Sequence, residues 1–237
     1  MKFLIQKCDN KIVYDFSFTL MESIKYQNWL RKKEIKVKYL NTFNDLPIVF
    51  MPFHREYVPI GSVEFVSAHL KQFYNIIPKP INVPEELFCF ANRKIFNGTD
   101  VGLKNSFGKA FIKSNDKIKD ICGIVNDDLI LKQGNYQISE LISIDSEWRV
   151  FVYRNTFVGL QNYCGEFTLF PNVETIESMI KNYKSAPVAY TLDIGVNDNS
   201  TFVIECHSFF SVGLYGFNNH GLLCQMFNQA YNELIKI

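Results

Sequence analysis

The chain has 237 residues, of which 47% are hydrophobic, and its 25 basic and 24 acidic residues leave a net charge of +1. This length fits one large domain or two small, closely associated ones, with enough apolar residues for a sizeable core. The near-neutral charge gives no indication of a nucleic-acid partner or of an anionic membrane surface.

Targeting signals are not evident in the sequence. The apolar run at the N-terminus is too short for a signal peptide, and no apolar stretch approaches the ~20 residues that a membrane helix needs. The six cysteines have neither the close spacing of a metal site nor a paired motif. We therefore expect a cytoplasmic protein without a membrane partner, with reduced and mostly buried thiols.

The first 75 residues predict alternating strands and helices, the pattern of a small α/β unit. Apolar runs indicate strands at 2–6, 35–40 and 48–53, and helical spacing indicates helices at 19–33 and 63–74. Pro78, Pro80 and Pro84 then bar helix continuation and favour an extended chain. This segment is the predicted boundary, with one domain at 1–84 and a second at 85–237.

Short strands dominate the second region. We expect them at 93–96, 109–113, 120–125, 137–144, 147–153 and 156–163. Helical patterns follow at 174–183 and, closing the chain, at 222–235. Between these helices, residues 189–206 predict two strands joined by a polar turn.

The first candidate site follows the strand that ends at Lys113. A polar turn and further lysines come after this strand. A lysine at the end of a strand, followed by a flexible polar loop, can neutralise and cover a polyphosphate. The stretch lacks the glycines of a P-loop, however, so from spacing alone solvated loop lysines are the favoured explanation.

The second candidate is the strand that begins near Glu147 and Arg149, two residues on the same face. An arginine within a strand is costly to bury unless it is paired or faces a cleft. Two interpretations remain open. Arg149 forms a structural ion pair with Glu147, or its planar guanidinium faces a cleft and binds phosphate oxygens.

The third candidate is the predicted hairpin at 189–206. Asp193 on one strand and Glu205 on the other can face the same side, with His207 two residues further along that face. Two carboxylates and an imidazole form a candidate divalent-metal site, and solvated polar positions are the alternative. The remaining histidines, at 54, 69 and 220, lie on unrelated segments without a nucleophile signature.

Taken in order, these segments resemble the ATP-grasp superfamily, in particular its small bacterial and phage members. VPIGSVEFV resembles the end of the N-terminal subdomain, and KAFIK followed by KDICG resembles the "FxK…KxFxG" pattern. SELISIDSEWRVFV resembles the adenine-side hinge and the strand that follows it. YTLDIGV…FVIECHSFFSVGLYG resembles the two metal-binding strands, usually written D…ExN, with a closing GLY turn.

The resemblance implies an α+β protein with the ATP-grasp fold, in which a small N-terminal α/β subdomain precedes two α+β subdomains that clamp a nucleotide. It implies that Lys113 contacts ATP and that Lys119 belongs to the loop that covers the phosphates. Arg149 and Lys119 would offset charge on the transferred phosphoryl group. The adenine-binding backbone would be Glu140, Leu141 and Ile142, and Glu147 would either orient Arg149 or touch the ribose.

The resemblance also implies that Asp193 and Glu205 bind Mg²⁺. His207 departs from the family pattern, which has asparagine at this position. Asparagine offers the oxygen that Mg²⁺ prefers, whereas an imidazole suits softer metals. His207 therefore points away, alters the second metal position, or lets Mn²⁺ substitute.

The activity that the resemblance implies is ATP-dependent joining of a carboxylate to an amine through an acyl phosphate, with a peptide or protein as one class of substrate. Two alternatives remain: an ATP-dependent phosphotransferase, and a nucleotide-binding or interaction module with little or no turnover. His207 is the main support for the last of these. A nucleic-acid partner is not expected, because the chain has no basic or aromatic stripe.

Overall fold

The computed structural model describes residues 1–236 except 44–46, 99–108, 119, 126–132 and 198–199. The chain divides into two compact units. The first consists of Met1–Pro78, Pro187–Tyr190 and Ser208–Ile237, and the second of Lys79–Ala186 and Thr191–His207. The sequence placed a single boundary at residue 84, whereas the C-terminal segment belongs to the same unit as the N-terminal one.

A parallel sheet forms the centre of the first unit. Its strand order is β2-β1-β3, with β1 at Lys2–Cys8, β2 at Lys36–Thr42 and β3 at Val58–Ile60. Both neighbours run parallel to β1, so Phe3 lies between Val37 and Val58. Pro59 on β3 is at the edge of the sheet, where a missing N–H is tolerated.

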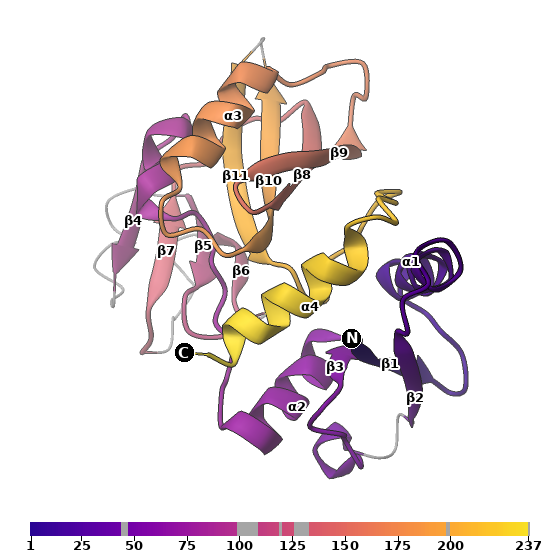
Figure 1. Ribbon diagram of the computed structural model, residues 1–237. Coiled ribbons are helices and arrows are strands. Elements are labelled where there is room, and N and C mark those ends of the chain that lie inside the picture. Colours follow the sequence, from indigo (N-terminus) through magenta and orange to yellow (C-terminus); the bar gives the residue numbers. More distant parts are fainter. Residues whose placement is uncertain (44–46, 99–108, 119, 126–132, 198–199, 237) are drawn as a thin grey trace. The chain divides into compact units, whose positions relative to one another are not determined.

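The helices of this unit are α1 at Asp15–Arg31, α2 at Val63–Tyr74, α4 at Leu223–Leu234 and the short 3₁₀ helix η1 at Ile48–Phe50 (Figure 1). The prediction of a strand at 48–53 is therefore wrong. Its apolar, β-branched residues favour a strand only where a neighbouring strand is available to pair with them. Here the N–H of Met51 instead bonds the carbonyl of Ile48 at 3.1 Å.

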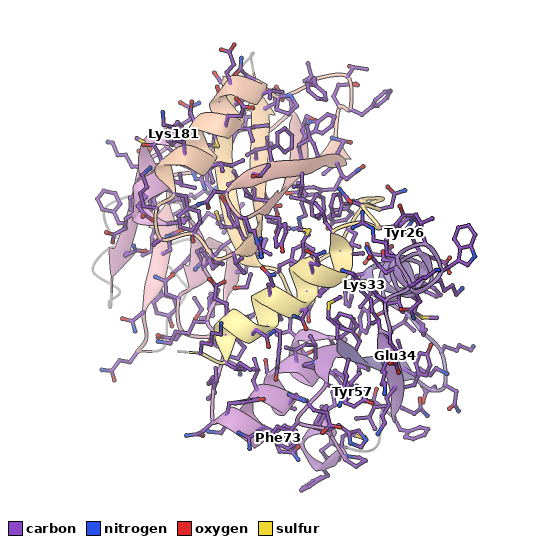
Figure 2. All side chains as sticks on the ribbon, viewed as in Figure 1. Tyr26, Lys33, Glu34, Tyr57, Phe73 and Lys181 are labelled. Atoms are coloured by element: carbon purple, nitrogen blue, oxygen red, sulfur yellow. The ribbon has the colours of Figure 1, made fainter. Side chains whose placement is uncertain are left out.

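Helix α2 has the bounds predicted from the sequence because both of its ends carry local signals. The Ser62 side chain accepts a hydrogen bond from the Phe65 N–H at the first turn, and Asn75 closes the helix in a left-handed conformation. The apolar face of α2 contributes to a buried cluster of Leu4, Met51, Phe53, Tyr57 and Phe65, with Phe73 beside it (Tyr57 and Phe73 are labelled in Figure 2).

The second unit contains two four-stranded sheets. The first is antiparallel, in the order β4-β7-β5-β6, with β4 at Ile95–Gly98, β5 at Ala110–Ser114, β6 at Cys122–Val125 and β7 at Tyr136–Ser139. The second has the order β11-β10-β8-β9, with β8 at Ser146–Tyr153, β9 at Thr156–Gly165, β10 at Ala189–Asn197 and β11 at Ser200–Ser208. The ends of β10 and β11 nearest residues 189 and 208 continue into the first unit.

Two helical segments complete the second unit, the 3₁₀ helix η2 at Glu85–Phe90 and helix α3 at Val173–Asn182. Helix α3 contacts both η2 and β9 and buries Ile176, Met179 and Ile180. None of the described helices is long and apolar enough to cross a membrane. The expectation of mostly buried thiols is wrong, because only two of the six free cysteines, Cys206 and Cys224, are buried and three are exposed.

Candidate functional site

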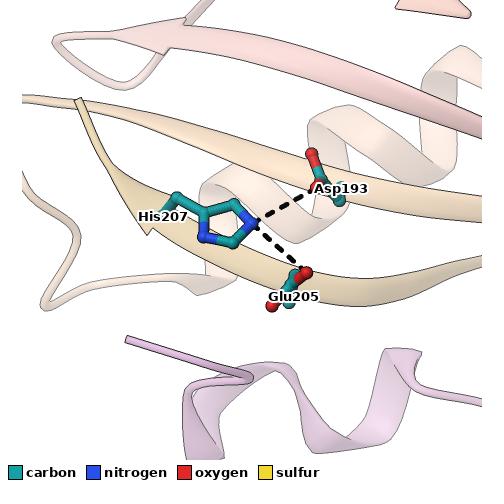
Figure 3. A group of neighbouring side chains, drawn as sticks. All are labelled: Asp193, Glu205 and His207. Atoms are coloured by element: carbon teal, nitrogen blue, oxygen red, sulfur yellow. Dashed lines mark ion pairs between the residues drawn. The ribbon is translucent and has the colours of Figure 1, made fainter. Parts of the chain in front are cut away.

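The hairpin of β10 and β11 brings together the three side chains of the candidate metal site. Ligand atoms of Asp193, Glu205 and His207 all lie within 4.8 Å of one another. The Nε2 atom of His207 is 3.3 Å from a carboxylate oxygen of Asp193 and 3.3 Å from one of Glu205 (Figure 3). His207 therefore points into the cluster and not away from it.

Asp193 is held by Arg149 on β8, a neighbouring strand of the same sheet. The Arg149 Nε and Nη2 atoms donate to the two oxygens of Asp193 at 2.8 and 2.7 Å. Both side chains are almost fully buried, with exposures of 8% and 2%. Burial raises the pKa of Asp193, but hydrogen bonds from Arg149 and His207 outweigh it and hold the pKa below its ordinary value.

Glu205 forms an ion pair with a lysine from the other sheet of the second unit. The Lys113 ammonium, at the end of β5, donates to Glu205 Oε2. Burial raises the pKa of Glu205, but His207 and Lys113 together lower it well below its ordinary range. The lysine and the carboxylate that the sequence singled out separately are thus direct partners.

The imidazole of His207 lies between two anions. Burial lowers its pKa, but hydrogen bonds to Asp193 and Glu205 outweigh this effect and raise the pKa to about 9. His207 is therefore protonated at neutral pH, and three cations, Lys113, Arg149 and His207, surround two carboxylates. A net positive cluster of this kind suits a polyanion such as a polyphosphate.

Tyr163 on β9 extends the network and was not identified from the sequence. Its hydroxyl donates to Glu147 Oε2 at 2.7 Å, and its ring lies 5.6 Å from the Arg149 guanidinium carbon. Burial, followed by the nearby Asp193 and Glu147, raises the pKa of Tyr163 well above its ordinary value, so the phenol stays protonated. The structure thus gives Glu147 a tyrosine partner and Arg149 an aspartate partner.

The predicted adenine hinge, residues 140–142, connects β7 in one sheet to β8 in the other. Its first residue is anchored, because Glu140 accepts a hydrogen bond from the Lys94 N–H at 2.8 Å and its own N–H bonds the Lys94 carbonyl at 3.1 Å. The Leu141 side chain is 44% exposed. Lys119, the other predicted phosphate-binding lysine, lies outside the described residues.

Comparison with known protein families shows to which family the chain belongs. Residues 90–223, more than half of the chain, match the family described as "ATP-grasp domain, R2K clade family 2". The chain belongs to this ATP-grasp family. No curated protein sequence matches it.

Solved structures with the ATP-grasp fold align over almost the whole chain. The RimK domain protein ATP-grasp from Sphaerobacter thermophilus DSM 20745 has a TM-score of 0.53 and 8% identity, covering 100% of both chains. D-cycloserine synthetase DcsG has a TM-score of 0.53 and 9% identity, covering 99% of this chain and 100% of its own. N5-carboxyaminoimidazole ribonucleotide synthetase from Thermotoga maritima has a TM-score of 0.50 and 12% identity, covering 94% and 75%. At these identities the likeness shows the fold.

In this ATP-grasp protein the donor set of the hairpin fits a divalent cation only in part. Two carboxylates are ligands that Mg²⁺ accepts, whereas the imidazole of His207 suits softer metals. Both oxygens of Asp193 already accept hydrogen bonds from Arg149. Asp193, Glu205 and His207 are nevertheless the residues that would hold such an ion.

Proposed function

We propose that the chain is an ATP- and Mg²⁺-dependent ligase that joins a carboxylate to an amine through an acyl phosphate. The observation that carries the proposal is the convergence of Lys113, Arg149 and His207 on Asp193 and Glu205. Membership in the ATP-grasp family and the synthetases among its structural neighbours support an ATP-dependent ligase in general.

The proposed chemistry is mainly the management of charge. When bound, ATP would supply the γ-phosphoryl group, and Asp193 and Glu205 would hold a divalent ion that offsets the charge of the phosphates. Lys113, Arg149 and Lys119 would offset the negative charge that builds up on the phosphoryl group during its transfer. Leu141 and Ile142 would present backbone groups to adenine. Glu147, held by Tyr163, keeps the Arg149 side of the cluster in place.

The size of the N-terminal segment bears on the acceptor. This segment, Met1–Pro78, which the family resemblance implies supplies much of the acceptor site, is short. This limited size supports a peptide or protein as the substrate and not a large pocket for a free metabolite.

Calorimetry tests the first step. Purified protein is titrated with ATP in the presence of Mg²⁺ and, separately, of Mn²⁺, and we expect saturable binding in at least one case. Absence of binding with both ions would overturn the proposal. Product analysis by mass spectrometry then separates ligation, which leaves an amide, from phosphoryl transfer, which leaves a phosphorylated product.

A nucleotide-binding module with little turnover is the second candidate, and the position of His207 supports it. The imidazolium lies between the two carboxylates that a metal would need. A large gain in ATP hydrolysis by the His207→Asn variant would favour this candidate. If the wild-type chain hydrolyses ATP and the variant does not exceed it, the ligase proposal is favoured.

A further inference from the structure

Asn82 lies between the strand that carries Lys113 and the strand that carries Glu205. It is 4% exposed, and its φ of +55° is in the left-handed region, which is uncommon for residues other than glycine. Its backbone carbonyl accepts a hydrogen bond of 2.7 Å from the N–H of Cys206, the residue that follows Glu205 on β11. The backbone of Asn82 therefore holds β11 directly beside the candidate metal ligand.

The side chain of Asn82 holds the other strand. Its Nδ2 donates to the backbone carbonyl of Ser114, the residue that follows Lys113, at 3.0 Å, and to Asn115 Oδ1 at 2.6 Å. A backbone carbonyl can only accept, so the amide nitrogen must face Ser114. One buried residue is thus hydrogen-bonded to the chain neighbours of both Lys113 and Glu205.

The next residue, Val83, is also held by two hydrogen bonds, and these keep Asn82 in place. The Gln137 side chain on β7 accepts from the Val83 N–H at 3.0 Å and donates to the Val83 carbonyl at 2.9 Å. Gln137 lies opposite Lys113 in the ladder between β5 and β7. Asn82 and Val83 are therefore both hydrogen-bonded to the sheet that carries Lys113, and Asn82 is also hydrogen-bonded to β11.

We propose that Asn82 is a positioning residue that sets the spacing between the Lys113 ammonium and the Glu205 carboxylate. It touches neither group and acts through Ser114 and Cys206. This inference rests on the proposed function, in which Lys113 contacts the nucleotide and Glu205 holds the metal. Small displacements of such groups are costly, because their interaction with a ligand depends on precise geometry.

The Asn82→Gly variant tests this role. Glycine adopts the left-handed conformation freely, so the backbone bond to Cys206 is kept while the amide bonds to Ser114 and Asn115 are lost. We expect the affinity for Mg²⁺·ATP in calorimetry to fall about tenfold. The Asn155→Gly variant is the matched control, because Asn155 has a φ of +55° in an exposed turn, and we expect its affinity to be unchanged.

A double-mutant cycle with Lys113→Met separates positioning from a general loss of structure. If Asn82 acts through Lys113, Asn82→Gly in the Lys113→Met background changes the affinity less than about twofold. Equal losses in both backgrounds would overturn the inference while leaving the proposed function intact. If the wild-type chain binds ATP with neither Mg²⁺ nor Mn²⁺, the proposed function fails and this inference falls with it.

The melting temperature of every variant is recorded alongside. Should Asn82→Gly fail to fold, Asn82→Ala replaces it in the cycle, because alanine is small and adds no charge that could couple to Lys113. Its side chain cannot donate to the Ser114 carbonyl, and any strain from the left-handed conformation acts in both backgrounds. Non-additivity with Lys113→Met again supports the positioning role, and additivity overturns it.

Discussion

The guanidinium of Arg149 binds the carboxylate of Asp193 with two hydrogen bonds, of 2.8 and 2.7 Å, and both side chains are more than nine-tenths buried. A buried charge without its partner costs far more than an intact pair contributes. The Arg149→Met variant is therefore expected to lose about 3 kcal/mol of unfolding free energy. Urea denaturation followed by circular dichroism measures this loss.

The double variant Arg149→Met, Asp193→Leu provides the control for this prediction. It removes both charges, so most of the lost stability is expected to return. A double variant as unstable as Arg149→Met would show that packing, and not the buried carboxylate left without Arg149, accounts for the loss.

Because of His207, we expect the stability of the protein to fall as the pH becomes alkaline. Its pKa is 6.5 in the unfolded chain and about 9 in the folded one. Below pH 6.5 both states are protonated and the stabilisation is complete. Between pH 6.5 and pH 9 only the folded state retains the proton, so the unfolding free energy falls as the pH rises. Denaturant titrations across this range should show the fall, and the His207→Asn variant should lack it.

His69 is expected to have the opposite effect, lowering the unfolding free energy as the pH becomes acidic. Its Nε2–H donates to the His54 carbonyl at 3.1 Å and its Nδ1 accepts from the Tyr231 hydroxyl at 2.9 Å, so the buried ring is neutral. Burial lowers the pKa of His69 from 6.5. Below pH 6.5 this histidine is protonated in the unfolded chain but stays neutral in the folded one. The unfolding free energy therefore falls as the pH is lowered.

The measurement for His69 is the slope of stability between pH 6.5 and about pH 5, above the range in which carboxylates titrate. The His69→Gln variant should have a shallower slope than the wild type. The His54→Gln variant is the matched control, because His69 bonds the backbone of residue 54 and not its side chain. Identical slopes in the wild type and His69→Gln would contradict the prediction.

Local signals account for the parts of the fold that the sequence predicted well. Helix α2 has a serine cap, regular apolar spacing and an asparagine at its end, all within one short segment. The hairpin likewise combines strand alternation with a polar turn, so Asp193 and Glu205 could be placed on one face before the structure was known. Each of these features depends on neighbours that are close in the sequence.

Contacts between distant segments account for what the sequence could not predict. Tyr163 meets Glu147 from the adjacent strand, and Asn82 meets Ser114 and Cys206 from two different sheets, so no local pattern marks either residue. Trp29 on α1 is a large apolar residue within a helix of regular apolar spacing, yet it is 81% exposed. Spacing defines a face of the helix, but packing decides how wide the buried part is.

The ion pairs around the candidate metal site predict how a divalent cation binds. Glu205 is already paired with Lys113 and His207, and Asp193 with Arg149 and His207. A metal ion alone must compete with these cations, whereas phosphates that arrive with it give Lys113 and Arg149 another partner. We therefore expect Mn²⁺ to bind weakly in calorimetry without nucleotide and at least about tenfold more tightly with ATP.

Lys113→Met is the variant that tests this competition. Without the ammonium, Glu205 loses one of its competing cations, so Mn²⁺ alone is expected to bind more tightly than to the wild type, while ATP binds more weakly. Lys181→Met, an exposed lysine on α3 (Figure 2), removes the same charge away from the pair and should leave both affinities unchanged. If Lys113→Met weakened Mn²⁺ and ATP binding together, Lys113 would support the metal site and not compete for it.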